Sequence, residues 1–298
     1  MKFWKKFGWF MLGLTPMVTL FMWQTLVVTI GMFIYSFIQG MQASKTGAEI
    51  VYDEIMDGFL TGTPYAIVMF VTYIGYLVIF GLWYLLMYCR KKQTGDWKNV
   101  LKPQRIGGII GCGFVLQITI SLALSLILPL FPNVLESYMS IMEGLGNESV
   151  FMILCVCILA PIGEELIFRG LTMRTMNKAM PWQAALIVQA VLFGLYHMNL
   201  VQGIYATLLG LLFGYVAYRY GSVVPGILLH MAVNSFSYVV GYIFPESLEE
   251  HTGVMLAIAM VGLAATAGFS MLFLKGVKRS QHDVSAVNEA DVQSIPAN

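Results

Sequence analysis

The chain of 298 residues is 58% hydrophobic and only 11% charged, and its mean hydropathy is +0.75. A soluble domain carries about 25% charged residues, so this composition excludes a soluble protein and indicates an all-α, polytopic membrane protein. The net charge is +1, and the basic residues occupy loops that alternate with acidic ones, which gives no reason to expect a nucleic-acid partner.

The apolar segments are long enough to cross a bilayer, which takes about 20 residues. The first follows Lys2, Lys5 and Lys6, and we interpret it as a retained span because its apolar core is too long for a signal peptide. In chain order the segments extend to about residue 38 and then cover about 63–88, 106–130, 149–174, 182–198, 202–218, 223–244 and 254–274.

Charges in the connecting segments predict the topology. Lys and Arg gather at the N-terminus and at 89–105, 174–178, 219 and 275–279, whereas 39–61, 131–149 and 245–251 are mostly acidic. Basic segments face the cytoplasm in membrane proteins. The alternation therefore predicts eight transmembrane helices with both termini in the cytoplasm.

Two other patterns indicate packing. Ala206, Gly210 and Gly214 recur every four residues, and such a small-residue stripe lets neighbouring helices approach closely. The four cysteines form neither a disulfide framework nor a zinc pattern, so we expect them to pack in or beside the helices. They are Cys89, Cys112, Cys155 and Cys157.

Three ionisable side chains, Glu164, Glu165 and Arg169, lie inside the fourth apolar segment. Each such residue costs at least about 2.5–3.5 kcal/mol at the centre of a membrane helix, so something must compensate for it. Glu165 and Arg169 are four residues apart and can form an ion pair. Glu164 is rotated by about 100° and has no local partner. We therefore predict that Glu164 does chemistry and that the other two support its helix.

Further polar groups follow on two later helices. Phe193 and His197 share one face of the fifth segment, and His230 and Asn234 share one face of the seventh. Taken alone, His197 is better explained as a helix-end histidine bonded to a carbonyl or water, and His230 with Asn234 is equally well explained as an interhelical hydrogen-bond pair. However, Glu164 and His197 lie about 21 and 24 Å from the same cytoplasmic turn, which predicts that they converge.

A buried carboxylate beside a histidine can hold and deprotonate a water molecule. A second histidine and an amide could then donate hydrogen bonds to a developing oxyanion, so the set suits hydrolysis of an amide without a covalent intermediate. Neither G-x-S-x-G nor H-E-x-x-H is present. The same glutamate and histidines could instead bind zinc with an open position for water, and the residues alone separate these two versions poorly.

The three motifs, Glu164-Glu165-x-x-x-Arg169, Phe193-x-x-x-His197 and His230-x-x-x-Asn234, resemble those of the CPBP family over residues 149–240. This family comprises glutamate-type CAAX prenyl endopeptidases and the bacteriocin-processing or self-immunity (Abi) proteins. The resemblance implies an intramembrane endopeptidase whose cavity opens towards the cytoplasm.

The resemblance also implies roles for the motif residues. Glu164 and His197 would activate water, His230 and Asn234 would form the oxyanion hole, and Glu165, Arg169 and Phe193 would support the site. No cofactor is expected. Zinc is the less favoured alternative, although the family was long described as metalloproteases.

We expect three helices in residues 1–148, the catalytic core in 149–245, the last helix in 246–280 and a polar, disordered tail in 281–298. The expected partners are a membrane-associated peptide or lipidated protein as substrate, the lipid bilayer and, as a further candidate, another membrane protein. The expected location is a bacterial cell membrane. The substrate itself is not predicted by the sequence.

Two other classes of function remain open. One is a non-catalytic scaffold or self-immunity factor that binds a membrane peptide or a sensor kinase. The other is an ion-coupled transporter that uses Glu164 and His197 as a proton relay, although the sequence shows no inverted repeat.

Overall fold

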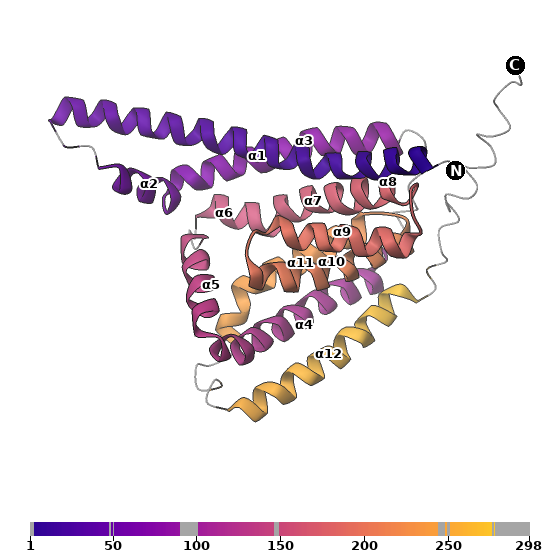
Figure 1. Ribbon diagram of the computed structural model, residues 1–298. Coiled ribbons are helices and arrows are strands. Elements are labelled where there is room, and N and C mark those ends of the chain that lie inside the picture. The colour runs from indigo at the N-terminus through magenta and orange to yellow at the C-terminus, as the bar shows by residue number, and fades with distance from the viewer. Residues whose placement is uncertain are drawn as a thin grey trace, which may run out of the picture.

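The structure is a computed structural model that describes residues 3–47, 49, 51–89, 101–145, 149–243, 248, 251–275 and 277. The described residues form helices and no strand, which confirms the predicted all-α membrane bundle (Figure 1). The elements are α1 (Phe3–Thr46), α2 (Tyr52–Leu60), α3 (Thr63–Tyr84), η1 (Leu85–Cys89), α4 (Pro103–Ile127), η3 (Leu128–Leu130), α5 (Pro132–Leu145), α6 (Val150–Leu154), η4 (Cys155–Leu159), α7 (Ala160–Glu165), η5 (Leu166–Met173), α8 (Arg174–Met176), α9 (Trp182–Tyr196), α10 (Leu200–Tyr220), α11 (Val224–Ile243) and α12 (Thr252–Leu274).

Six helical segments are long and apolar enough to cross a membrane, and two shorter apolar helices accompany them. The six are Phe3–Thr46, Thr63–Cys89, Pro103–Leu130, Val150–Met176, Leu200–Tyr220 and Thr252–Leu274, and the shorter two are Trp182–Tyr196 and Val224–Val240. They coincide with the eight apolar segments of the sequence. The number of crossings and the side on which the termini lie stay predictions.

The nearly continuous helix from α6 to α8 lies in the middle of the molecule (Figure 1). The pair α1 and α3 packs on one side of it, and α9, α10 and α11 pack on the other. Helix α4 contacts α11, and α12 packs against α4 at the outer edge. The helix that carries Glu164 is therefore covered from both sides.

Small residues bring the central helices into close contact. A Cβ on Gly210 would lie 3.1 Å from the Cα of Ala190, so the predicted stripe of α10 packs directly on α9. In the same interface, a Cβ on Gly194 would collide with the side chain of Thr207 and the carbonyl of Gly203. Close approach of this kind is how helices associate in lipid.

Two segments that we expected to be loops are largely helical. Helix α1 continues past residue 38 to Thr46, because this stretch contains no proline, and it ends before Gly47, whose φ is +71°. Pro132 begins α5 instead of opening a loop, since its fixed φ suits the first turn of a helix. The expected disorder of 281–298 and the basic residues at 90–100 lie outside the described residues.

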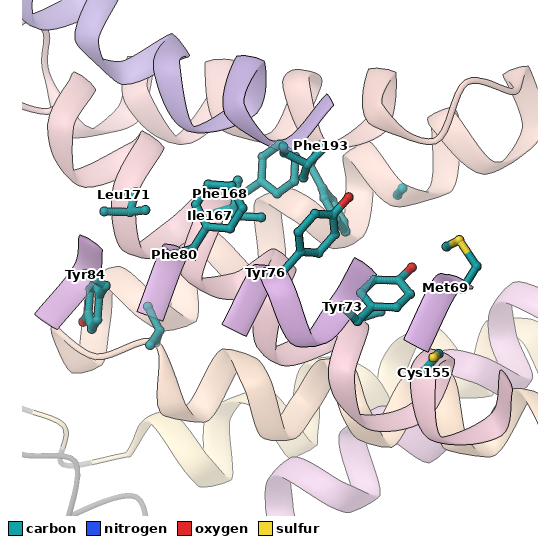
Figure 2. Close-up of a cluster of buried hydrophobic side chains, with 14 of the residues drawn as sticks. Met69, Tyr73, Tyr76, Phe80, Tyr84, Cys155, Ile167, Phe168, Leu171 and Phe193 are labelled. Carbon is teal, nitrogen blue, oxygen red and sulfur yellow. The ribbon is translucent and has the colours of Figure 1, made fainter. Parts of the chain in front are cut away.

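A hydrophobic cluster connects α3 to the centre of the molecule (Figure 2). Phe80 of α3 is fully buried, and so is Phe168 of η5. The Phe168 ring makes an edge contact with Phe193 of α9, with ring centroids 5.1 Å apart. The aromatic core therefore extends from α3 to the helix that ends at His197.

Candidate active site

The helix that carries both glutamates is interrupted on both sides of the short α7 by the irregular turns η4 and η5. In η4 the hydrogen bonds span five residues, as in the bond from the Ala160 N–H to the Cys155 carbonyl. Pro161 has no N–H, so the Val156 carbonyl lacks the donor that this pattern would supply. The side-chain amide of Asn234 donates to that carbonyl at 2.9 Å and so connects α11 to the glutamate helix.

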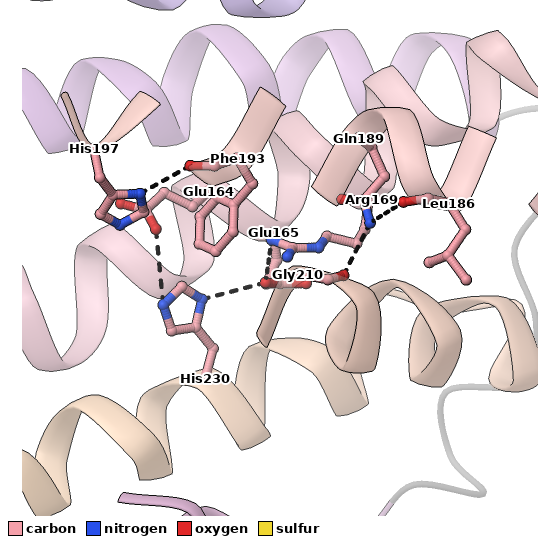
Figure 3. Close-up of polar contacts among 9 residues, drawn as sticks. All are labelled: Glu164, Glu165, Arg169, Leu186, Gln189, Phe193, His197, Gly210 and His230. Carbon is pink, nitrogen blue, oxygen red and sulfur yellow. Dashed lines mark hydrogen bonds and ion pairs between the residues drawn. The ribbon is translucent and has the colours of Figure 1, made fainter. Parts of the chain in front are cut away.

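Glu165 and Arg169 form the ion pair that their spacing predicted. The Arg169 Nη1 donates to Glu165 Oε1 at 2.7 Å, and both side chains are fully buried (Figure 3). The guanidinium carbon lies 4.3 Å from the ring centroid of Phe193 and 5.4 Å from that of Phe213, so two aromatic faces also contact the charge. This pair has no exposed surface from which to act on a substrate.

Glu164 lies in a different environment. Its Oε2 is 3.7 Å from the Nε2 of His230, and 7% of its side chain stays accessible, against 0% for Glu165. The other ring nitrogen of His230, Nδ1, lies 3.2 Å from Glu165 Oε1. His230 therefore bridges the two glutamates, and the accessible carboxylate is the one without a basic side chain of its own.

His197 is oriented by the end of its own helix. Its backbone N–H bonds to the Gly194 carbonyl, so the last turn of α9 is tight. The Phe193 carbonyl instead lies 2.8 Å from the Nδ1 of His197. A carbonyl only accepts hydrogen bonds, so Nδ1 carries the hydrogen and Nε2 keeps a lone pair. Bonding to a carbonyl thus accounts for one ring nitrogen and leaves the other able to take a proton.

The Phe193 ring contacts both histidines. Its centroid is 4.9 Å from the ring of His197 and 5.8 Å from that of His230, and Figure 3 shows Glu164 in the same group. The predicted convergence of the three motifs is therefore present. Asn234 lies one turn farther along α11, where one hydrogen of its amide is bonded to Val156. Its second amide hydrogen is left for another acceptor.

Sequence reasoning did not find two parts of this site. Phe213 of α10 lies 4.9 Å from the His230 ring and also covers Arg169, but an aromatic residue in an apolar span carries no distinguishing pattern. The Val156 carbonyl was also missed. Its signal was Pro161, five residues later, which removes a backbone donor from the middle of a helix.

The arrangement supplies groups for acid–base chemistry. An accessible carboxylate, an imidazole with a free lone pair and a second imidazole between two carboxylates can hold and move protons. Within the described residues, no group of three His, Cys, Asp or Glu side chains is placed to hold a metal ion.

The six long apolar helical segments define an integral membrane protein, and its buried carboxylate–imidazole site lies among them. Residues 146–236 match the family described as Type II CAAX prenyl endopeptidase Rce1-like, which confirms the resemblance to the CPBP proteases. The matched segment contains all three motifs. Neither a curated protein nor a solved structure shows significant similarity to the chain.

Proposed function

We propose that the protein hydrolyses a peptide bond of a membrane-associated peptide or lipidated protein with a water molecule activated by Glu164 and His197. The observation that carries this proposal is the contrast between the two adjacent glutamates. Glu165 is neutralised by Arg169 at 2.7 Å and fully buried, whereas Glu164 is partly accessible and has only an imidazole beside it, at 3.7 Å. A carboxylate inside a membrane that no arginine or lysine neutralises is expected to be functional.

The proposed reaction begins with water held between Glu164 and the Nε2 of His197. The water oxygen attacks the scissile carbonyl carbon while one of its protons passes to Glu164. The resulting oxyanion accepts hydrogen bonds from His230 and from the free amide hydrogen of Asn234. When the tetrahedral intermediate collapses, the C–N bond breaks and Glu164 gives its proton to the leaving amine.

This role sets a requirement for His230. Its Nδ1 faces Glu165, so it can donate to an oxyanion only from Nε2. A histidine that donates from both nitrogens is an imidazolium, and its charge and that of Arg169 balance the charges of the two glutamates. The site then carries no net charge before the water reacts.

We propose a lipidated, CAAX-type tail or a membrane-bound leader peptide as substrate and a bacterial cell membrane as location. Both substrates would reach a site buried among membrane helices along the bilayer. The reaction needs no cofactor in this proposal, and a zinc-dependent reaction is its alternative.

The test compares the purified wild-type protein with Glu164→Gln on prenylated tail peptides and double-glycine leader peptides, with and without a chelator. Glu136→Gln, which changes an exposed glutamate of α5, is the matched control. We expect Glu164→Gln to lower cleavage by about 10²–10⁴-fold, as the loss of a general base does, and the control to cleave like wild type.

The other outcomes separate the alternatives. Cleavage that the chelator abolishes would favour the zinc-dependent version. No cleavage of any peptide, together with a biological phenotype that survives Glu164→Gln, would favour the scaffold or self-immunity role.

A further inference from the structure

Helix α1 lies outside the segment 146–236 that matches the family, yet it carries a polar side chain, Gln24, that bonds to a neighbouring helix. The hydroxyl of Tyr76 in α3 donates a hydrogen bond to Gln24 Oε1 at 2.9 Å, and Tyr76 is fully buried. Lipid offers no replacement partner for either group, so the bond joins α1 to α3.

Tyr76 also lies directly against the helix that carries both glutamates. A Cβ on Gly163, the residue before Glu164, would lie 3.2 Å from the Cβ of Tyr76 and 3.5 Å from an atom of its ring. This is a close approach of two helices, made possible by a glycine. A displacement of Tyr76 would therefore shift the backbone that carries Glu164.

The same face of α1 contacts the end of α9. Phe21 precedes Gln24 by three residues and so lies on its side of the helix. The ring centroid of Phe21 is 5.9 Å from that of Tyr196, the last residue of α9, and the Tyr196 ring is 5.4 Å from the ring of His197. These side chains belong to one hydrophobic cluster (Figure 2).

A second bond fixes the register of α1 on α3 at this level. Trp23 Nε1 donates to the Thr72 carbonyl at 3.1 Å, one turn before Tyr76. The indole of Trp23 also occupies the space in which a side chain at Gly75 would lie. Helix α1 can therefore neither slide nor rotate on α3 without losing these contacts.

We propose that Gln24, Phe21 and Tyr76 are positioning residues of the hydrolytic site. Through Gly163 and Tyr196, they hold the backbones of Glu164 and His197 at the separation that the attacking water requires. The inference rests on the proposed function, and it gives α1 and α3, which carry none of the three motifs, a role in catalysis.

The first test breaks the bond between α1 and α3 from each end, in Tyr76→Phe, Gln24→Leu and the double variant. A displacement of about 1 Å can cost about 10²-fold in rate. We therefore expect each single variant to lower kcat by at least about tenfold with KM within about twofold. The double variant should lose no more than the single ones, because both changes remove the same bond.

Tyr88→Phe is the matched control for Tyr76→Phe. Tyr88 is buried on the continuation of the same helix, about 18 Å farther along, and its hydroxyl bonds to the Thr175 hydroxyl at 2.9 Å. This control also loses a buried bond between two helices, so its Tm should fall about as much as that of Tyr76→Phe, but its kcat should stay at the wild-type value.

The second test concerns the contact with α9. Phe21→Ala should lower kcat by at least about threefold, whereas Phe33→Ala, which changes an exposed phenylalanine of the same helix, should leave it unchanged. Wild-type kcat values for Phe21→Ala, Tyr76→Phe and Gln24→Leu, or an equal loss of kcat in Tyr88→Phe, would overturn the inference.

A third measurement does not require cleavage. Dicyclohexylcarbodiimide reacts with accessible membrane carboxyls, and mass spectrometry can follow its addition to Glu164. We expect Tyr76→Phe and Gln24→Leu to change this rate by at least about threefold and Tyr88→Phe to leave it unchanged. If the wild type cleaves nothing but the rate changes, the proposed function fails and the positioning of Glu164 stands. If the wild type cleaves and neither kcat nor the rate responds, the inference alone fails.

Discussion

The side chain of Asn234 donates a hydrogen bond to the backbone carbonyl of Val156, which has no donor from its own helix because Pro161 lacks an N–H. His197 is held in a similar way, since its Nδ1 bonds to the Phe193 carbonyl at the end of α9. Two of the motif side chains are thus oriented by carbonyls that irregular helix geometry leaves without a backbone donor. The irregularities of these helices are therefore part of how the site is built.

Replacing Asn234 by Ala should destabilise the protein as well as impair cleavage. The Val156 carbonyl would lose its donor inside the membrane bundle, and the expected loss is about 0.5–2 kcal/mol, the range for interhelical hydrogen bonds in lipid. Titration with SDS, followed by circular dichroism, measures the change in the free energy of unfolding. Adding Pro161→Ala restores an N–H near Val156 and should recover part of this free energy.

The control for this pair is Ser237→Ala. Its exposed hydroxyl bonds to the Asn234 carbonyl on the same helix, so its loss should change stability little. Two results would show that Asn234 does not act through the Val156 carbonyl. One is an Asn234→Ala variant as stable as Ser237→Ala. The other is a Pro161→Ala change that destabilises the wild type and Asn234→Ala equally.

Helical periodicity predicted the contacts that lie within one helix. Glu165 and Arg169 pair because residues four apart face each other, and the same rule placed His230 and Asn234 on one face of α11. Periodicity could not predict the five-residue hydrogen bonds of η4. Pro161 signals that a donor is missing from this helix, but the residue that replaces it comes from 78 positions away along the chain.

Contacts between helices depend on how closely the helices approach, which periodicity does not contain. His230 reaches Glu165 where α11 passes close to α7, and Gly226 allows this approach because a Cβ there would lie 2.7 Å from Glu165 Oε2. From the sequence, Gly226 looks like many other glycines of an apolar segment. The bridge made by His230 between the two glutamates was therefore visible only in the structure.

Exchanging Glu165 for Gln should destabilise the protein far more than exchanging Glu164 for Gln. The first change leaves the fully buried Arg169 without its counter-charge, and breaking a buried pair in this way costs about 3–5 kcal/mol. The second removes a carboxylate that has only the His230 imidazole beside it, at 3.7 Å, and leaves no arginine without its counter-charge. Yield from membranes and SDS titration measure both effects. A fully stable but inactive Glu165→Gln would instead give Glu165 a direct role in catalysis.

Replacing Gly194 by Ala should shift the end of α9, on which His197 lies. The added methyl group would collide with the Thr207 side chain and the Gly203 carbonyl, and such overpacking costs about 1–3 kcal/mol. Gly81→Ala in α3 is the matched control, because nothing lies within 4 Å of its Cβ position, and it should be neutral or slightly stabilising. Equal Tm values for the two variants would show that the α9–α10 interface can relax.

The two ring nitrogens of His230 can be tested separately with two amides. The nitrogen of an Asn side chain can take the place of Nδ1, which contacts Glu165, and that of a Gln side chain can take the place of Nε2, which faces Glu164. If Nε2 stabilises the oxyanion, His230→Asn should fold but lose about 10²–10³-fold in kcat, the usual cost of one oxyanion donor. His230→Gln should be less stable but retain more activity. Circular dichroism and cleavage assays on both variants measure these effects, and the reverse order of activity would assign the catalytic contact to Nδ1.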